Sequence, residues 1–179
     1  MSTQTLTTAT WQLDPAHSEV AFTVRHLMSK VRGTFDEYTG TITTPSEDPT
    51  AASVTAEIKL ASVNTRNAQR DGHLRSADLF DATNDATMTF VSTGITGSGT
   101  DYEIAGDLTI NGVTKPVVLD AELLGVDVDA YGATRLGVEA RTSISRKEFG
   151  FDFNVPLEGD KLLIGDKVDI TLTIEAVQA

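Results

Sequence analysis

Apolar residues recur at every second position along most of this chain. In residues 53–60, for example, Val54, Ala56, Ile58 and Leu60 alternate with mostly polar side chains. A period of two places one face of a β-strand against a core and the other against water. Similar runs predict strands over residues 20–26, 33–43, 54–60, 88–90, 102–110, 117–123, 136–144 and 168–174.

Turn signals between these runs indicate how the strands connect. Asn111-Gly112 predicts a tight hairpin, because both positions of such a turn need a positive φ. Successive hairpins with one apolar face per strand favour an all-β chain, an eight-stranded antiparallel up-and-down β-barrel in which closure removes the exposed edges. A β-sandwich is the structural alternative.

One long insertion separates the third and fourth predicted strands. Residues 64–81 alternate poorly and place Arg66, Arg70 and His73 at helical intervals, which predicts a short helix and loop at one end of the barrel. With Arg75 these residues form a basic cluster at the predicted mouth. Such a cluster suits a polar or anionic headgroup, and it equally suits a helix held on the barrel through loop carbonyls and neighbouring acids.

The inward face of the predicted barrel defines a candidate ligand-binding lumen. Small inward residues such as Ala56, Gly106 and Ala121 suit a hollow interior, and the same pattern equally suits a small barrel that is filled by its own side chains. His26 shares the inward face of its strand, either as a satisfied core histidine or as a ligand contact. The predicted lumen residues are Phe22, Val24, His26, Ile58, Met88, Phe90, Ile104, Leu108, Ile110, Leu119, Val138 and Ala140.

Composition excludes several classes of function. A chain of 179 residues with 40% hydrophobic content suits one domain, predicted over residues 11–179 after a flexible tail at residues 1–10. A formal net charge of −12 argues against nucleic-acid binding, and the absence of cysteine excludes thiolate chemistry. The three histidines lack metal-ligand spacing and no nucleophile elbow occurs, so we expect neither a metal site nor catalytic residues.

The N-terminal residues MSTQTLTTAT lack the pattern of an export signal, and no apolar run is long enough to span a bilayer as a helix. These features predict a cytoplasmic protein without stable membrane insertion.

Several stretches of this sequence resemble the YceI-like, polyisoprenoid-binding family, whose architecture is similar to that of lipocalins. They are WQLDPAHS at 11–18 with FTVRHL at 22–27, RDGHLRSADLF at 70–80, GDLTINGVTKP at 106–116, SRKEFG at 145–150 and IGDKV at 164–168. The resemblance implies an apolar lumen that holds the tail of an isoprenoid or quinone-like lipid, with the headgroup near His26, Arg70, His73 and Arg75. It implies no enzyme activity and no other cofactor.

We therefore expect a protein that binds a long apolar lipid for transport, storage or sequestration. Its expected partner is this small molecule, and a homodimer is left open. Two other functions remain as alternatives. One is an enzyme that acts on an isoprenoid-type ligand with His26 as acid or base, and the other is a stress-related interaction protein with a filled barrel.

Overall fold

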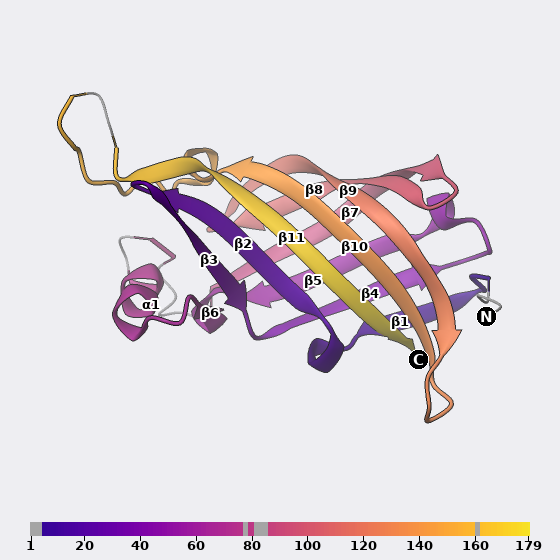
Figure 1. The fold of residues 1–179 in the computed structure, drawn as a ribbon. Coiled ribbons are helices and arrows are strands. Elements are labelled where there is room, and N and C mark those ends of the chain that lie inside the picture. Colours follow the sequence, from indigo (N-terminus) through magenta and orange to yellow (C-terminus); the bar gives the residue numbers. More distant parts are fainter. Residues whose placement is uncertain (1–4, 77–78, 81–85, 160–161) are drawn as a thin grey trace.

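Antiparallel strands make up most of the computed structural model, which describes residues 5–76, 79–80, 86–159 and 162–179 (Figure 1). Among these residues α1 (Ala68–Arg75) is the one α-helix. The strands are β1 (Ala9–Leu13), β2 (Glu19–His26), β3 (Ser29–Phe35), β4 (Tyr38–Thr44), β5 (Ser53–Lys59), β6 (Val63–Asn64), β7 (Thr87–Ser98), β8 (Asp101–Ile110), β9 (Val113–Val128), β10 (Thr134–Ser145) and β11 (Ile164–Gln178).

Eight of these strands close into a ring in the order β1, β4, β5, β7, β8, β9, β10, β11, and β1 pairs with β11 to complete it. All of the pairings are antiparallel. The predicted eight-stranded antiparallel barrel is therefore confirmed, with one exchange: the predicted strand over residues 20–26 is β2, outside the ring, and β1 takes its place. The helical insertion also lies where it was expected, between the third and fourth strands of the ring.

The remaining strands, β2, β3 and β6, extend the sheet from one edge of β11. The first part of β11 pairs with β2, and its last residues pair with β1, so one strand edge serves two partners in succession. The ladder is interrupted between β1 and β2 by a 3-10 turn at Pro15–His17, where proline supplies no N–H to a sheet. The sheet thus forks at this turn.

The predicted strand over residues 33–43 is divided in the structure. Phe35 ends β3 and Tyr38 begins β4, and both side chains are buried although they are three residues apart. A single strand with a period of two would turn one of them outward. Exposed Asp36 and Glu37 make the break that allows both aromatic rings to face inward.

Part of the predicted tail lies in the barrel. Leu6 is buried, and β1 begins at Ala9, two residues before the predicted domain boundary. Trp11 in β1 is 0% exposed, and its indole N–H donates to Thr44 Oγ1 at 3.0 Å. The aromatic ring thus fastens the first strand to β4. Residues 1–4, for which a flexible tail was also predicted, lie outside the described residues.

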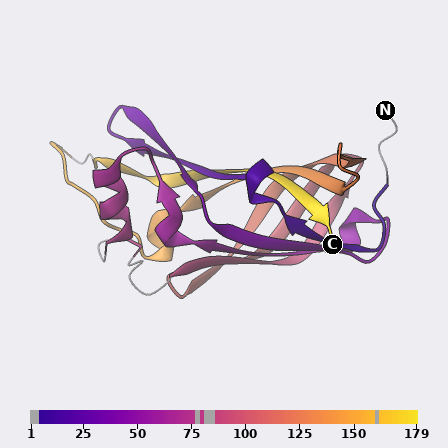
Figure 2. The same cartoon turned by 90° about the horizontal axis from the view of Figure 1, so that it is seen from below.

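The two ends of the barrel carry different elements. The end with α1, the β2–β3 turn and the loop after residue 149 is called here the α1 end, and the opposite end, with the β7–β8 and β9–β10 turns, the far end (Figures 1 and 2). In the described part of the chain, α1 is too short and too polar to cross a membrane as a helix.

Candidate ligand-binding site

The barrel encloses an apolar chamber of about 180 Å³ along its axis. Inward side chains from β4, β5 and β7 to β11 line it, and nearly all are aliphatic or aromatic. Space for it arises where Ala140 on β10 faces Ala121 on β9, since two methyl groups replace two bulky side chains at one level of the barrel. Toward the far end, Leu6, Ile42 and Leu136 close this first chamber by packing with Trp11.

A second apolar chamber of about 150 Å³ lies toward the α1 end. Four phenylalanines form a continuous row along its wall. The ring centroids are 5.4 Å apart for Phe22 and Phe35, 6.0 Å for Phe35 and Phe80, and 5.3 Å for Phe80 and Phe151. The rings are tilted or edge-on, which is a favourable aromatic geometry. They form the wall against which an apolar ligand in this chamber would pack.

The two chambers share three lining residues, Val20, Met88 and Ile170. These side chains therefore lie between the two chambers, and we call this place the constriction. Methionine is unbranched and flexible, so Met88 can change rotamer more easily than its neighbours to admit a chain. The lumen accordingly suits a long, thin apolar molecule better than a compact one.

Arg146 is the charged residue along the described walls of the second chamber, and it is buried. Its guanidinium donates to four main-chain carbonyls, those of Phe151 at 2.6 Å, Phe153 at 2.8 Å, Gly165 at 2.8 Å and Ile164 at 3.3 Å. Burial lowers the pKa of Arg146. Its N–H groups are thus engaged by the loop that covers this end, while the aliphatic stem contributes to the chamber wall.

Most of the side chains predicted to face the lumen line one of the chambers. Their positions indicate that the alternation in the sequence gives the correct face for these strands. The residues in contact with the first chamber, the second or both are Phe22, Val24, Ile58, Met88, Phe90, Ile104, Leu108, Ile110, Leu119, Val138 and Ala140.

His26 departs from this pattern, and its predicted inward orientation is wrong. It is exposed at the end of β2, next to the turn that leads into β3, and it lines neither chamber. The β2–β3 hairpin extends beyond the enclosed part of the barrel here, so that alternation no longer separates an inside from an outside. Because of this position, the structure gives no support to His26 as an acid or base for a ligand in the lumen.

The predicted mouth cluster is spread around α1 and lines neither chamber. Arg70 donates to Thr65 Oγ1 at 2.7 Å and to the Thr65 carbonyl at 2.9 Å. Arg75 donates to the carbonyls of Ala61 and Val63. Both arginines therefore hold the helix on the barrel through loop carbonyls, which was the alternative to headgroup binding.

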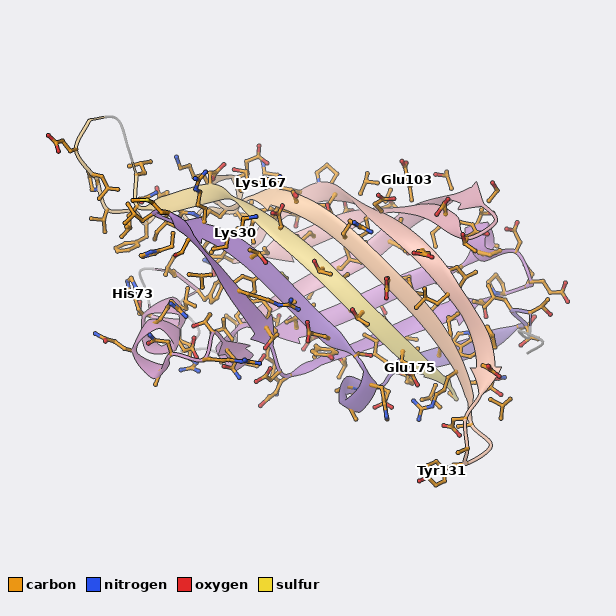
Figure 3. All side chains as sticks on the ribbon, in the orientation of Figure 1. Lys30, His73, Glu103, Tyr131, Lys167 and Glu175 are labelled. Carbon is orange, nitrogen blue, oxygen red and sulfur yellow. The ribbon has the colours of Figure 1, made fainter. Side chains whose placement is uncertain are left out.

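The other two members of the cluster point elsewhere. The His73 ring packs edge-on against the Phe153 ring, with the two ring centroids 4.7 Å apart. Figure 3 labels His73 beside α1. Arg66 is exposed and lines a polar groove outside the barrel wall, together with Arg32 and Asp36. Of the predicted mouth residues, Arg66 is thus the one whose position suits contact with a polar group.

Sequence reasoning missed several residues that shape the lumen. Phe35, Phe80 and Phe151 line the second chamber, and none of them was among the predicted lumen residues. Phe80 follows the helical insertion, and Phe151 lies in the loop after β10 that Arg146 fixes. The available signal was the repeat of Phe149, Phe151 and Phe153. It indicates that this segment is buried, but not against which strands it packs.

No group of three or more histidine and acidic side chains is arranged to hold a metal ion in the described part of the chain. His17 contacts Asp14 through a 2.7 Å hydrogen bond, and the hydroxyl of Ser18 both donates to and accepts from the backbone of Glu175. These residues fix the 3-10 turn between β1 and β2 against β11.

Taken together, a closed antiparallel barrel and an apolar lumen define a β-barrel of the class that encloses small ligands. Comparison with known proteins assigns this chain more narrowly. Residues 11–176 match the YceI-like domain, and the chain belongs to the YceI-like family. It is 41% identical over 163 residues to Protein YceI of Shigella flexneri, a match that covers 90% of this chain and 82% of that protein.

Solved structures show the same fold. The YCEI protein of Campylobacter jejuni is 33% identical, with a TM-score of 0.72 and coverage of 100% of this chain and 99% of that chain. A polyisoprenoid-binding domain from Saccharophagus degradans has a TM-score of 0.71 at 17% identity and covers 94% of this chain and 98% of that chain. At this low identity the second likeness concerns the fold.

Proposed function

We propose that this protein binds a long apolar lipid of the isoprenoid or quinone-like class in its lumen and acts as a carrier, store or sequestering protein. The observation that carries the proposal is the pair of adjacent chambers, which have almost entirely apolar walls and share three lining residues. The described walls present almost only hydrocarbon to the chambers, and burial of an unpaired hydroxyl or carboxylate there is costly, so such a lumen selects the hydrocarbon part of a ligand. The polyisoprenoid-binding domain with the same fold supports the choice of ligand class.

The free energy gained by burying hydrocarbon, compared with the cost of association, favours a ligand that reaches both chambers. A cavity of about 150 Å³ accepts a molecule such as benzene, so each chamber accommodates a short stretch of chain. Each buried CH₂ contributes about 0.8 kcal/mol, whereas association costs about 4 to 15 kcal/mol. A chain confined to one chamber therefore binds marginally, and one that passes Met88 into the other binds usefully.

A polar headgroup remains outside the hydrocarbon walls in this proposal. Arg66 is our candidate for its contact, because the outer groove that it lines borders the lumen: it shares Phe35 with the second chamber and Tyr38 with the first. Arg70 and Arg75 contribute by holding the α1 segment in place. Among the described residues that line the lumen, we find no arrangement of acid, base and nucleophile. We therefore propose that the protein binds its ligand rather than converts it.

The direct test is organic extraction of freshly purified protein followed by mass spectrometry, with native mass spectrometry in parallel. We expect a copurifying lipid with a long hydrocarbon chain. If protein from a host rich in isoprenoids consistently carries none and takes up none of the isoprenoid alcohols offered, the proposal is wrong.

Substitution of Ala140 tests whether the lumen is the site. Ala140 is 6% exposed and lines the first chamber, so Ala140→Trp places an indole in the space proposed for the ligand. We expect Tm to hold or rise while lipid uptake disappears. In a filled barrel the same change would overpack the core and cost about 1 to 3 kcal/mol.

Glu139→Trp provides the matched control, because Glu139 is the exposed neighbour on the outer face of β10. It should leave uptake unchanged. Normal uptake by Ala140→Trp would place the ligand outside this chamber.

A further inference from the structure

The turn between β2 and β3 exposes two large apolar side chains at the α1 end. Leu27 is 52% exposed and Met28 is 90% exposed. Single exposed apolar residues are ordinary on a protein surface, but adjacent ones at the tip of a hairpin are not explained by folding.

The backbone conformation of this turn is unfavourable for the residue that occupies it. His26 pairs with Ser29, so Leu27 and Met28 form a two-residue hairpin loop, and Leu27 has a φ of 56°. A leucine is strained in the left-handed region, where glycine or asparagine is preferred. The Asn111-Gly112 turn, with φ values of 55° and 75°, has the expected residues for its conformation. A bulky apolar residue thus occupies position 27 despite a cost to the turn.

A second loop adds apolar side chains to the same place. The Leu27 N–H donates to the Leu163 carbonyl at 2.8 Å, and the Leu163 N–H donates to the Val155 carbonyl at 3.1 Å. Val155 is 40% exposed and Leu162 is 46% exposed. Leu27, Met28, Val155 and Leu162 are called here the apolar tip, because main-chain hydrogen bonds join the two loops that carry them.

The charges around the apolar tip are mixed, and the cations are the nearest to it in sequence. The apolar tip is flanked by Arg25 and Lys30, and residues 25–30 contain no acid. Lys30 and Lys167 project from the strands on this half of the molecule (Figure 3). The sequence of the nearby loop, residues 150–163, contains Asp152, Glu158 and Asp160 against Lys161, which offsets the charge of Arg25 and Lys30. The segment before and within α1 has more arginines than acids, and the sequence after it adds three aspartates at 78, 81 and 85. The far-end turns carry Glu47, Asp48, Asp101, Asp127 and Asp129.

We propose that the apolar tip docks on the surface of an anionic lipid bilayer and inserts Leu27 and Met28 between the headgroups. Exposed apolar side chains beside Arg25 and Lys30 are suited to such an interface, and these local contacts have to outweigh the repulsion between an anionic bilayer and a chain with a net charge of −12. Phe151 and Ile164, from the loop that meets this turn, line the second chamber, so docking brings that chamber toward the membrane. The contact is a surface function that goes beyond ligand binding in the lumen and does not depend on it.

Cosedimentation with vesicles of phosphatidylglycerol and phosphatidylcholine tests the proposal with the intact protein. We expect the protein to bind, to bind less to phosphatidylcholine alone, and to be partly released by high salt, because the cations are screened while the apolar contact persists. The variant Leu27→Gly with Met28→Asn should bind at least about tenfold more weakly. Its Tm should hold or rise, since glycine and asparagine suit this turn.

Tyr131→Ser is the matched control, because Tyr131 is 96% exposed in a turn at the far end (Figure 3). It should bind vesicles as the unchanged protein does. The proposal is overturned if the unchanged protein does not bind, if the tip variant binds normally, or if Tyr131→Ser is equally impaired. It is also overturned if the tip variant changes only self-association in sedimentation velocity.

Uptake of an isoprenoid alcohol from detergent should be unchanged in the tip variant. This measurement separates failure of the docking proposal from failure of the proposed lumen function.

Discussion

Arg135 joins three carboxylates from separate parts of the chain. Its Nε donates to Asp129 at 2.6 Å, and its Nη1 donates to Asp14 at 2.8 Å and to Glu175 at 3.0 Å. The hydrogen bond from Arg135, followed by that from His17, lowers the pKa of Asp14 to about 2. One guanidinium therefore connects the fork between β1 and β2 to the β9–β10 turn and to β11.

This arrangement predicts a pH-dependent contribution of Asp14 to stability. An aspartate titrates near pH 3.9 in an unfolded chain, so a lowered pKa stabilises the fold above about pH 4, and this contribution is lost as the pH falls toward 2. We expect Asp14→Asn to reduce the free energy of unfolding by about 1 to 2 kcal/mol at pH 7. Urea denaturation across this range checks the result, and an equal difference at pH 7 and pH 2 would contradict it.

Among the elements, the loop from residue 150 to residue 163 depends on a single side chain for much of its support. Arg146 donates to carbonyls at both ends of this loop, and Asn154 contributes further hydrogen bonds to Ile164. A lysine in place of Arg146 cannot reproduce the planar fork that reaches four acceptors. The closure of the second chamber at this end is thus tied to one guanidinium.

We expect Arg146→Lys to lower the free energy of unfolding by about 2 to 4 kcal/mol, because buried carbonyls lose their donors. Limited proteolysis should then cut within residues 152–159 faster than in the unchanged protein. Lys147→Ala is the neighbouring control, since Lys147 is exposed. If Arg146→Lys matched this control in both measurements, the loop would be held by other contacts.

Elements with a strong local signal were predictable, and those defined by distant partners were not. Asn111-Gly112 forms the expected hairpin, because its positive φ values are a local property of these residues. Residues 33–43 were predicted as one strand because each half alternates well. The break at Asp36 depends on the burial of both Phe35 and Tyr38, which only the closed barrel determines.

At the scale of the whole molecule, the sequence could predict which side chains face the lumen, but not that the lumen is divided into two chambers. Alternation selected inward residues along long strands, and it failed for His26, where the hairpin leaves the barrel. The constriction at Val20, Met88 and Ile170 joins three strands that are distant in sequence. No pattern within one strand reveals how far such side chains reach across the axis.

The constriction predicts selectivity for chain length. Met88→Trp should block passage between the chambers and weaken binding of geranylgeraniol at least about tenfold, because part of the chain no longer enters. Binding of the shorter geraniol should change little. Met88→Ala is the opposite variant and should retain both ligands. Competition with a fluorescent lipid measures these affinities, and equal losses for both alcohols in Met88→Trp would argue against two joined chambers.

The pairing of β1 with β11 affects how this protein is made. Trp11 lies opposite Gln178, so the ring cannot close until almost the whole 179-residue chain has left the ribosome. Until then β1 and β10 are open sheet edges, which can pair with other chains. Contacts between residues so distant in sequence also slow folding. We therefore expect synthesis to leave a period in which the nascent chain needs protection from aggregation, ending only when β11 emerges.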